Sequence, residues 1–124
     1  MLMNDQKIFR RAKKGIINSP FNFFLFQSLF ESSLSAQNVF LKKSKFLNQE
    51  FIFINSSVFI ENEFLKLIKI GVLRREVDGQ GLTSKVRITP IGRKVLESNP
   101  NLFNHKTTLL KKLITCIKYQ LSAR

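Results

Sequence analysis

The residues able to do covalent or acid–base chemistry are few and scattered along the chain. There is one cysteine, Cys116, and one histidine, His105, in 124 residues. A zinc site needs about four ligands and a disulfide needs two thiols, so we expect no metal site and no redox framework. The eight carboxylates include no pair on a predicted apolar pocket, which acid–base catalysis would need. Gly79-Gln80-Gly81 lacks the strand-to-helix context of a phosphate loop. We predict no enzyme activity, no cofactor and no small-molecule ligand.

Charge is the property that most needs an explanation. Lys plus Arg number 21 against 8 Asp plus Glu, a net charge of +13. Residues 1–62 hold 8 basic and 4 acidic residues, and residues 63–124 hold 13 basic and 4 acidic residues, so most of the excess lies in the second half. Such an excess attracts polyanions, which makes nucleic acid or an anionic membrane surface the first partners to consider. A solvated basic face without a partner is the alternative.

Composition predicts one folded domain spanning residues 1–124. Hydrophobic residues make up 44% of the chain, too many for a disordered basic tail, and there is no repeat or long linker. Basic residues followed by the apolar stretch 21–30 imitate a secretion signal, but Pro20, Asn22 and Gln27 interrupt the apolar pattern. No segment has the roughly 18 continuous apolar residues that a membrane span needs. We therefore expect a soluble cytoplasmic protein.

The first half of the chain predicts helices. Residues 5–17 form a basic amphipathic helix, and Ser19 with Pro20 begins a second helix that reaches about residue 32. Phenylalanines lie on more than one side of this second helix, so its own domain or a partner must bury them. Ser35 caps a third helix over 36–43. The run 51–54 fits either a short strand or a hydrophobic turn.

The second half predicts a helix, a hairpin and two more helices. Ser57 caps a helix over 57–70, stopped by Gly71. Residues 72–77 and 82–89 then form a β-hairpin around the turn glycines. Thr89 and Pro90 begin a short helix that Asn99 and Pro100 end. An amphipathic helix over 104–122 carries an apolar stripe of Leu110, Leu113, Ile114, Ile117 and Leu121.

Three consecutive segments carry a family resemblance: the stretch from Phe64 to Arg75, the hairpin after it, and Thr89-Pro90-Ile91-Gly92-Arg93. Together they resemble the winged helix-turn-helix domains of MarR- and PadR-like regulators. The turn 76–83 also resembles that of a small uncharacterised cyanobacterial winged-helix family. The resemblance covers about residues 20–96. It implies an α+β winged-helix core over 20–97, flanked by the helices 5–17 and 104–122. It also implies binding to double-stranded DNA, with helix 57–70 in the major groove and the hairpin as a wing.

The candidate nucleic-acid contacts come from the helix, the hairpin and the helix after it. They are Asn62, Lys66, Lys69, Arg74, Arg75, Lys85, Arg87, Arg93 and Lys94. The cations of the hairpin and of the helix after it would neutralise phosphates along one edge. We expect the two terminal helices to form a homodimer interface.

Two other classes of function remain open. Glu61 and Glu63 stand at the start of the supposed reading helix, where a DNA reader should be positive. Helix 57–70 could therefore belong to a protein-interaction module that docks a partner through Phe59. The basic helix 5–17 could also lie on an anionic membrane surface, although its apolar stripe is short.

Overall fold

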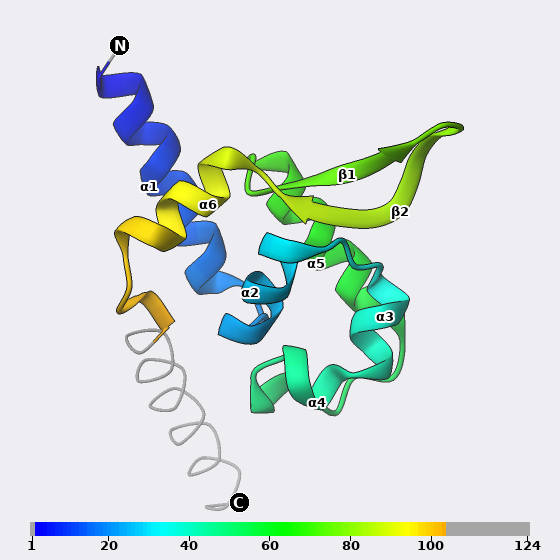
Figure 1. Cartoon of the computed structure of the whole chain (residues 1–124). Coiled ribbons are helices and arrows are strands. Elements are labelled where there is room, and N and C mark those ends of the chain that lie inside the picture. The colour runs from blue at the N-terminus through cyan, green and yellow to red at the C-terminus, as the bar shows by residue number, and fades with distance from the viewer. Residues whose placement is uncertain (1, 104–124) are drawn as a thin grey trace, which may run out of the picture.

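The computed structural model describes residues 2–103, so the predicted helix 104–122 lies outside the described residues. The elements run in the order α1 (Leu2–Asn18), α2 (Phe23–Glu31), α3 (Ala36–Leu41), α4 (Lys43–Phe46), η1 (Gln49–Phe51), α5 (Ser57–Lys69), β1 (Leu73–Asp78), β2 (Gly81–Ile88) and α6 (Pro90–Ser98). The strands form one antiparallel hairpin that projects from the helical body (Figure 1). The predicted α+β class with a β-hairpin is confirmed.

The N-terminal helix α1 packs against the body through its apolar stripe. Ala12 and Ile16 are fully buried, and α1 contacts α5 and α6. Its basic residues at 10, 11, 13 and 14 remain exposed. A membrane surface would have to bind this apolar stripe, but its residues Ala12 and Ile16 are already covered by protein. No helix within residues 2–103 is long and apolar enough to cross a membrane.

The second helix begins later than predicted. Ser19 does not cap it: its buried hydroxyl donates a hydrogen bond to the carbonyl of Ile16 at 2.8 Å. Phe21 is fully buried and forms an isolated antiparallel bridge with Leu47, which keeps the backbone extended at this point. Asn22 is the actual cap, because its side chain accepts a hydrogen bond from the Leu25 amide at 3.1 Å.

Between α3 and α5 the chain forms two short helices, α4 and η1, followed by a turn. Ser35 caps α3 as predicted, but the predicted helix 36–43 stops at Leu41, because the backbone at Lys42 (φ −121°, ψ 38°) leaves the helical region before α4 begins. The run 51–54 is a turn, not a strand, and it buries Ile54. Lys43 Nζ donates to the Ile54 carbonyl at 2.8 Å and fastens this turn to α4.

The helix α5 and the hairpin follow the predicted pattern closely. Ser56, one residue before the predicted cap, accepts a hydrogen bond from the Val58 amide at 3.2 Å. Gly71 ends the helix at φ 87°, a conformation that favours glycine. The register then pairs Leu73 with Ile88 and Arg74 with Arg87, with a bulge between Arg75 and Val77.

The start of α6 ties the end of the hairpin to the start of β1. Thr89 caps α6 and Pro90 occupies its first turn, both as predicted. The Thr89 hydroxyl also reaches the Val72 carbonyl at 3.0 Å. Gly92 lies so close to this junction that a Cβ there would meet the Val72 carbonyl oxygen at 2.7 Å. The base of the hairpin thus packs closely against the start of α6.

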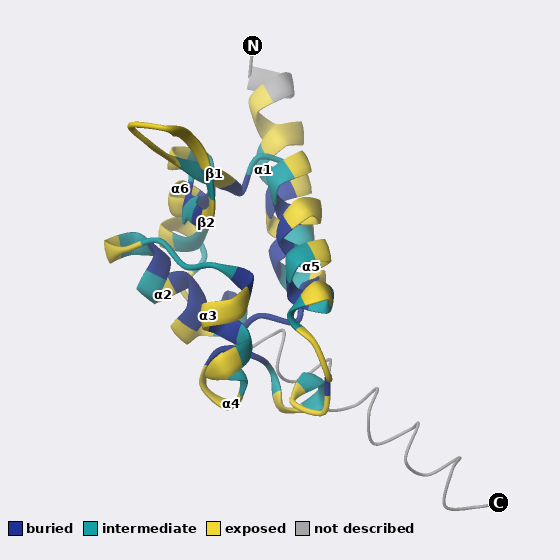
Figure 2. Cartoon of the chain, turned by 90° about the vertical axis from the view of Figure 1, so that its right-hand side faces the viewer, coloured by how far each residue is buried: buried dark blue, intermediate teal, exposed yellow. Residues whose placement is uncertain are grey.

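The core lies where α2, α3, α5 and the base of the hairpin meet, as the buried segments of Figure 2 show. Phe21, Phe26 and Phe64 are its largest fully buried side chains, and the ring centroids of Phe21 and Phe64 lie 5.3 Å apart. Twelve of the thirteen phenylalanines lie at or before position 64, so the first half supplies most of the core. The second half adds Val72, Val86 and Val95, which are also buried.

Candidate nucleic-acid interface

The candidate contacts on α5 lie together on its exposed face. Asn62, Lys66 and Lys69 are exposed, whereas Ile60, Phe64 and Leu67 on the opposite face are buried. The Lys66 side chain is 73% exposed and forms an ion pair with Glu63 at 2.7 Å. Helical spacing therefore places these three polar residues where the sequence predicts them.

Arg75 does not lie with the other hairpin arginines. It forms an ion pair with Glu61 of α5 and donates a second hydrogen bond to the Ser84 carbonyl at 2.8 Å. Its side chain is only 18% exposed. Arg75 thus holds the hairpin against α5, and its charge is already matched by a carboxylate. Arg75 was predicted to contact phosphate, but its mostly buried side chain does not belong to the exposed cations.

The same ion pairs change the electrostatics at the start of α5. Glu61 is paired with Arg75, and Glu63 is paired with Lys66. Both carboxylates that argued against a DNA-reading helix are therefore matched by cations within the protein. Two paired acids repel an approaching phosphate less than two free ones would.

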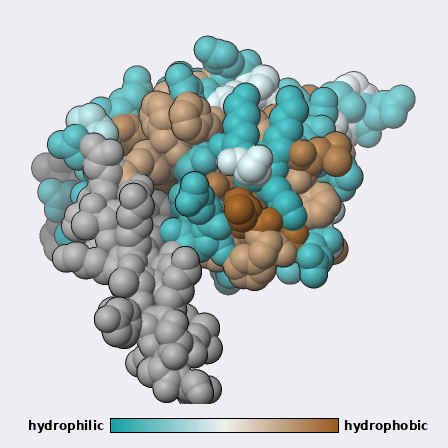
Figure 3. All heavy atoms as spheres, turned by 90° about the horizontal axis from the view of Figure 1, so that it is seen from below, coloured by the Kyte–Doolittle hydropathy of each residue, from teal (hydrophilic) through white to brown (hydrophobic). Residues whose placement is uncertain are grey.

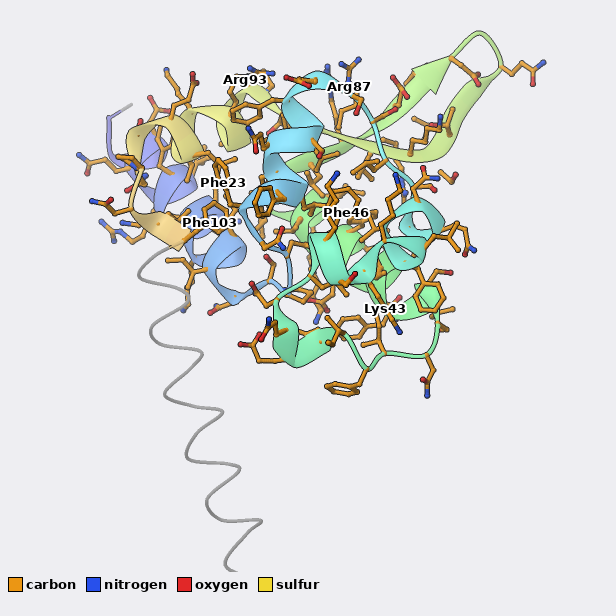
Figure 4. The ribbon with its side chains drawn as sticks, turned by 60° about the horizontal axis from the view of Figure 1, so that its bottom comes forward. Phe23, Lys43, Phe46, Arg87, Arg93 and Phe103 are labelled. Atoms are coloured by element: carbon orange, nitrogen blue, oxygen red, sulfur yellow. The ribbon has the colours of Figure 1, made fainter. Side chains whose placement is uncertain are left out.

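Three arginines from three elements meet at one hollow on the surface. Arg74 of β1, Arg87 of β2 and Arg93 of α6 line it, together with Leu29, Phe30, Ile88 and Pro90, around a volume of about 330 Å³. We call this site the arginine hollow. Figure 4 shows Arg87 and Arg93 along the same edge of the molecule.

Two of these arginines are held in place. The Arg93 guanidinium lies 4.4 Å from the centroid of the Phe30 ring, and its Nη2 donates to the Phe30 carbonyl at 3.1 Å. Arg87 Nη1 lies 3.5 Å from Glu76 Oε1, with the Arg87 side chain 41% exposed. Stacking on an aromatic face and hydrogen bonding to a carbonyl both restrict a guanidinium without neutralising it.

Arg74 carries one of the two charges of the hollow that no carboxylate among residues 2–103 matches, the other being that of Arg93. Arg74 is exposed, forms no ion pair within residues 2–103, and stands directly opposite Arg87 in the hairpin register. Like charges directly opposite in an antiparallel pair are destabilising. Three arginines against the single carboxylate of Glu76 leave an excess of positive charge that an anion would relieve.

The remaining candidates lie elsewhere. Lys85 is exposed on β2, outside the lining of the arginine hollow. Lys94 lies on α6 with its Nζ 6.0 Å from the centroid of the Phe9 ring, directed to α1 rather than to the hollow. The cations of the hairpin and of α6, predicted to form a single edge, are therefore divided between the arginine hollow, the exposed part of β2 at Lys85 and the neighbourhood of α1, while Arg75 is paired with α5.

Phe59 does not have the exposure expected of a docking anchor. It is half-buried, packs on the hydrophobic core, and stacks on Phe51 with centroids 5.9 Å apart. The turn before α5 instead exposes Phe53, at 74%. The stacking partner was missed because residues 51–54 gave no periodic signal from which their orientation could be predicted.

The part of the chain that the structure describes holds no group of three or more His, Cys, Asp or Glu residues that could bind a metal ion. The chain belongs to the Npun_F0494-like family, whose model matches residues 2–118. No curated protein and no solved structure matches the chain. The family description names no activity or ligand, so the function has to be argued from the residues.

Proposed function

We propose that this Npun_F0494-like protein is a winged-helix DNA-binding protein of the transcription-regulator type, which contacts the phosphate backbone through the arginine hollow. The convergence of Arg74, Arg87 and Arg93 carries this proposal. Guanidinium groups bind phosphate oxygens in a bidentate manner, and an opposed pair of arginines gains most from a bound anion. The net charge of +13 favours the same class of partner over long distances.

The arrangement of the helices supports a winged-helix role. In the proposed complex α5 enters the major groove, because Asn62, Lys66 and Lys69 line its exposed face and its acidic residues are paired. The helix α3 packs against α5 even though α4 and η1 intervene in the chain. The long connection between them therefore does not prevent the helix pair that a helix-turn-helix needs.

The far part of the hairpin is suited to contact a groove wall. Val77 and Leu82 stand opposite each other near the tip and are 65% and 75% exposed. An apolar cross-strand pair at the tip of a projecting hairpin can lie on sugar or base edges in the minor groove. In this proposal the base of the wing binds phosphate and its tip supplies apolar contact.

A salt titration of binding to random duplex DNA tests the proposal. Each phosphate contact contributes about 0.9 to the slope of log K against log salt, so the double variant Arg74→Ala with Arg87→Ala should lower the slope by about 2. The matched control is Lys13→Ala with Lys14→Ala, which removes the same charge from the exposed face of α1. Absence of binding at low salt, or equal slopes for the two double variants, would overturn the proposal.

A further inference from the structure

An apolar groove lies between α2 and the segment that follows α6. Phe23, Phe26, Phe30, Leu96 and Phe103 are its main lining, around a volume of about 240 Å³. We call it the phenylalanine groove. Figure 4 shows Phe23 beside Phe103, and Figure 3 shows apolar side chains open to solvent on the face seen from below. None of the three arginines of the arginine hollow lines this groove.

The groove is bordered by unusually exposed aromatic surface. Phe23 and Phe24 are 51% and 55% exposed, although sequence periodicity places Phe24 on the same side of its helix as the buried Leu25. Their rings contact each other edge to face, with centroids 6.0 Å apart. Exposed apolar surface of this kind next to a groove marks an interaction site.

The chain itself supplies an apolar segment at this site. Phe103, the last described residue, forms one wall of the groove, with its ring centroid 5.7 Å from those of Phe23 and Phe26. Twenty-one residues follow it, and the family match continues to residue 118. Their pattern predicts an amphipathic helix with the stripe Leu110, Leu113, Ile114, Ile117 and Leu121. This stripe needs an apolar surface to cover it.

We propose that the phenylalanine groove of one chain binds the segment 104–121 of a second copy, so that two copies exchange these segments in a homodimer. A helix over 104–121 would be about 27 Å long, whereas α2, which forms one side of the groove, is about 14 Å long. Because Phe103 itself forms a wall of the groove, the residues that follow it in the same chain would have to reverse direction to enter that groove. The later part of the stripe therefore fits the groove of a partner better than its own.

Two complementary variants of the full chain test this exchange. Phe23→Lys places a cation in the groove, and Leu113→Glu places an anion on the stripe. The molar mass in solution, measured by light scattering, should be twice 14.4 kDa for the wild type and should fall to 14.4 kDa for each variant alone. We expect the apparent dimer dissociation constant of each variant to rise at least about 100-fold, about tenfold for each of the two grooves.

Mixing the two variants distinguishes exchange between copies from packing within one chain. A mixed dimer has one native groove and one Lys–Glu pair, so mixing should restore the doubled mass. Phe53→Lys, at a side chain that is 74% exposed and outside the groove, is the control and should remain dimeric. If Phe23→Lys does not fold by circular dichroism, Gln27→Lys replaces it, because Gln27 is exposed and also lines the groove.

A monomeric wild type, or a mixture that stays monomeric, would overturn the exchange. Both outcomes leave the difference in salt slope between the two double variants as a separate readout, because Arg74 and Arg87 do not line the groove. Failure of the exchange can therefore be told apart from failure of the proposed function.

Discussion

Arg74→Gln should stabilise the free protein at low salt, although it removes a charged side chain from an exposed strand. Arg74 stands opposite Arg87 and forms no ion pair among the described residues, so the substitution ends a like-charge repulsion. Cross-strand pairs of this kind change the free energy of unfolding by about 0.2–1 kcal/mol. For a chain of this length the gain corresponds to roughly 1–5 °C in Tm.

Thermal unfolding at two ionic strengths measures this effect. At about 0.01 M salt the Debye length is about 30 Å, and at 1 M it is about 3 Å, so the gain in Tm should shrink strongly in high salt. Arg10→Gln is the matched control, because it removes the same charge from an exposed position on α1. It separates repulsion within the arginine hollow from the general self-repulsion of a protein with a charge of +13.

Added duplex DNA should reverse the order of stability. A ligand that binds only the folded state stabilises it by RT ln(1 + [L]/Kd), so the wild type gains more than a variant with weaker binding. The reasoning is refuted if Arg74→Gln lowers Tm at low salt, or if Arg10→Gln raises it equally. An unchanged order in the presence of DNA would show that the relief of repulsion has no connection with polyanion binding.

Two further substitutions test the structure that positions the site. Glu61→Gln leaves the mostly buried Arg75 without its ion-pair partner and should lower the free energy of unfolding, measured by urea titration, by about 1–2 kcal/mol. An effect below about 0.3 kcal/mol would contradict the role of this ion pair in holding the hairpin against α5. Gly92→Ala should lower it by about 1–3 kcal/mol, because the new Cβ would overlap the Val72 carbonyl oxygen and the gain in helix propensity is only about 1 kcal/mol. Gly79→Ala, which meets no atom within 4 Å, is the control and should be nearly neutral.

Local signals in the sequence predicted those elements that depend on local interactions. Ser35, Thr89 and Pro90 act where capping preferences place them, and Gly79 and Gly81 lie at the turn that joins the two strands of the hairpin. The predicted start of α2 was wrong, because the bridge that keeps the backbone extended at Phe21 joins it to Leu47, a residue far away in the chain. No pattern around Ser19 and Pro20 could reveal a partner at position 47.

The same limit applies to the candidate site. Composition and alternation were enough to find the basic residues on the hairpin and α5. They could not show which of these residues would form ion pairs with carboxylates. The partner of Arg75 lies 14 positions away, and the carbonyl that holds Arg93 lies 63 positions away. The arginine hollow therefore required the tertiary structure, because only folding brings β1, β2 and α6 to the end of α2.

Phe30 lines both the arginine hollow and the phenylalanine groove. Its ring supports the Arg93 guanidinium in the hollow, and the same side chain forms part of the wall of the groove. An anion that drew Arg93 away from this ring would alter the wall of the groove, and a helix seated in the groove would restrain the ring on which Arg93 rests. Through this shared side chain the two proposed sites would be coupled, and by thermodynamic linkage any effect of dimerisation on DNA affinity would be matched by an equal effect of DNA on dimerisation.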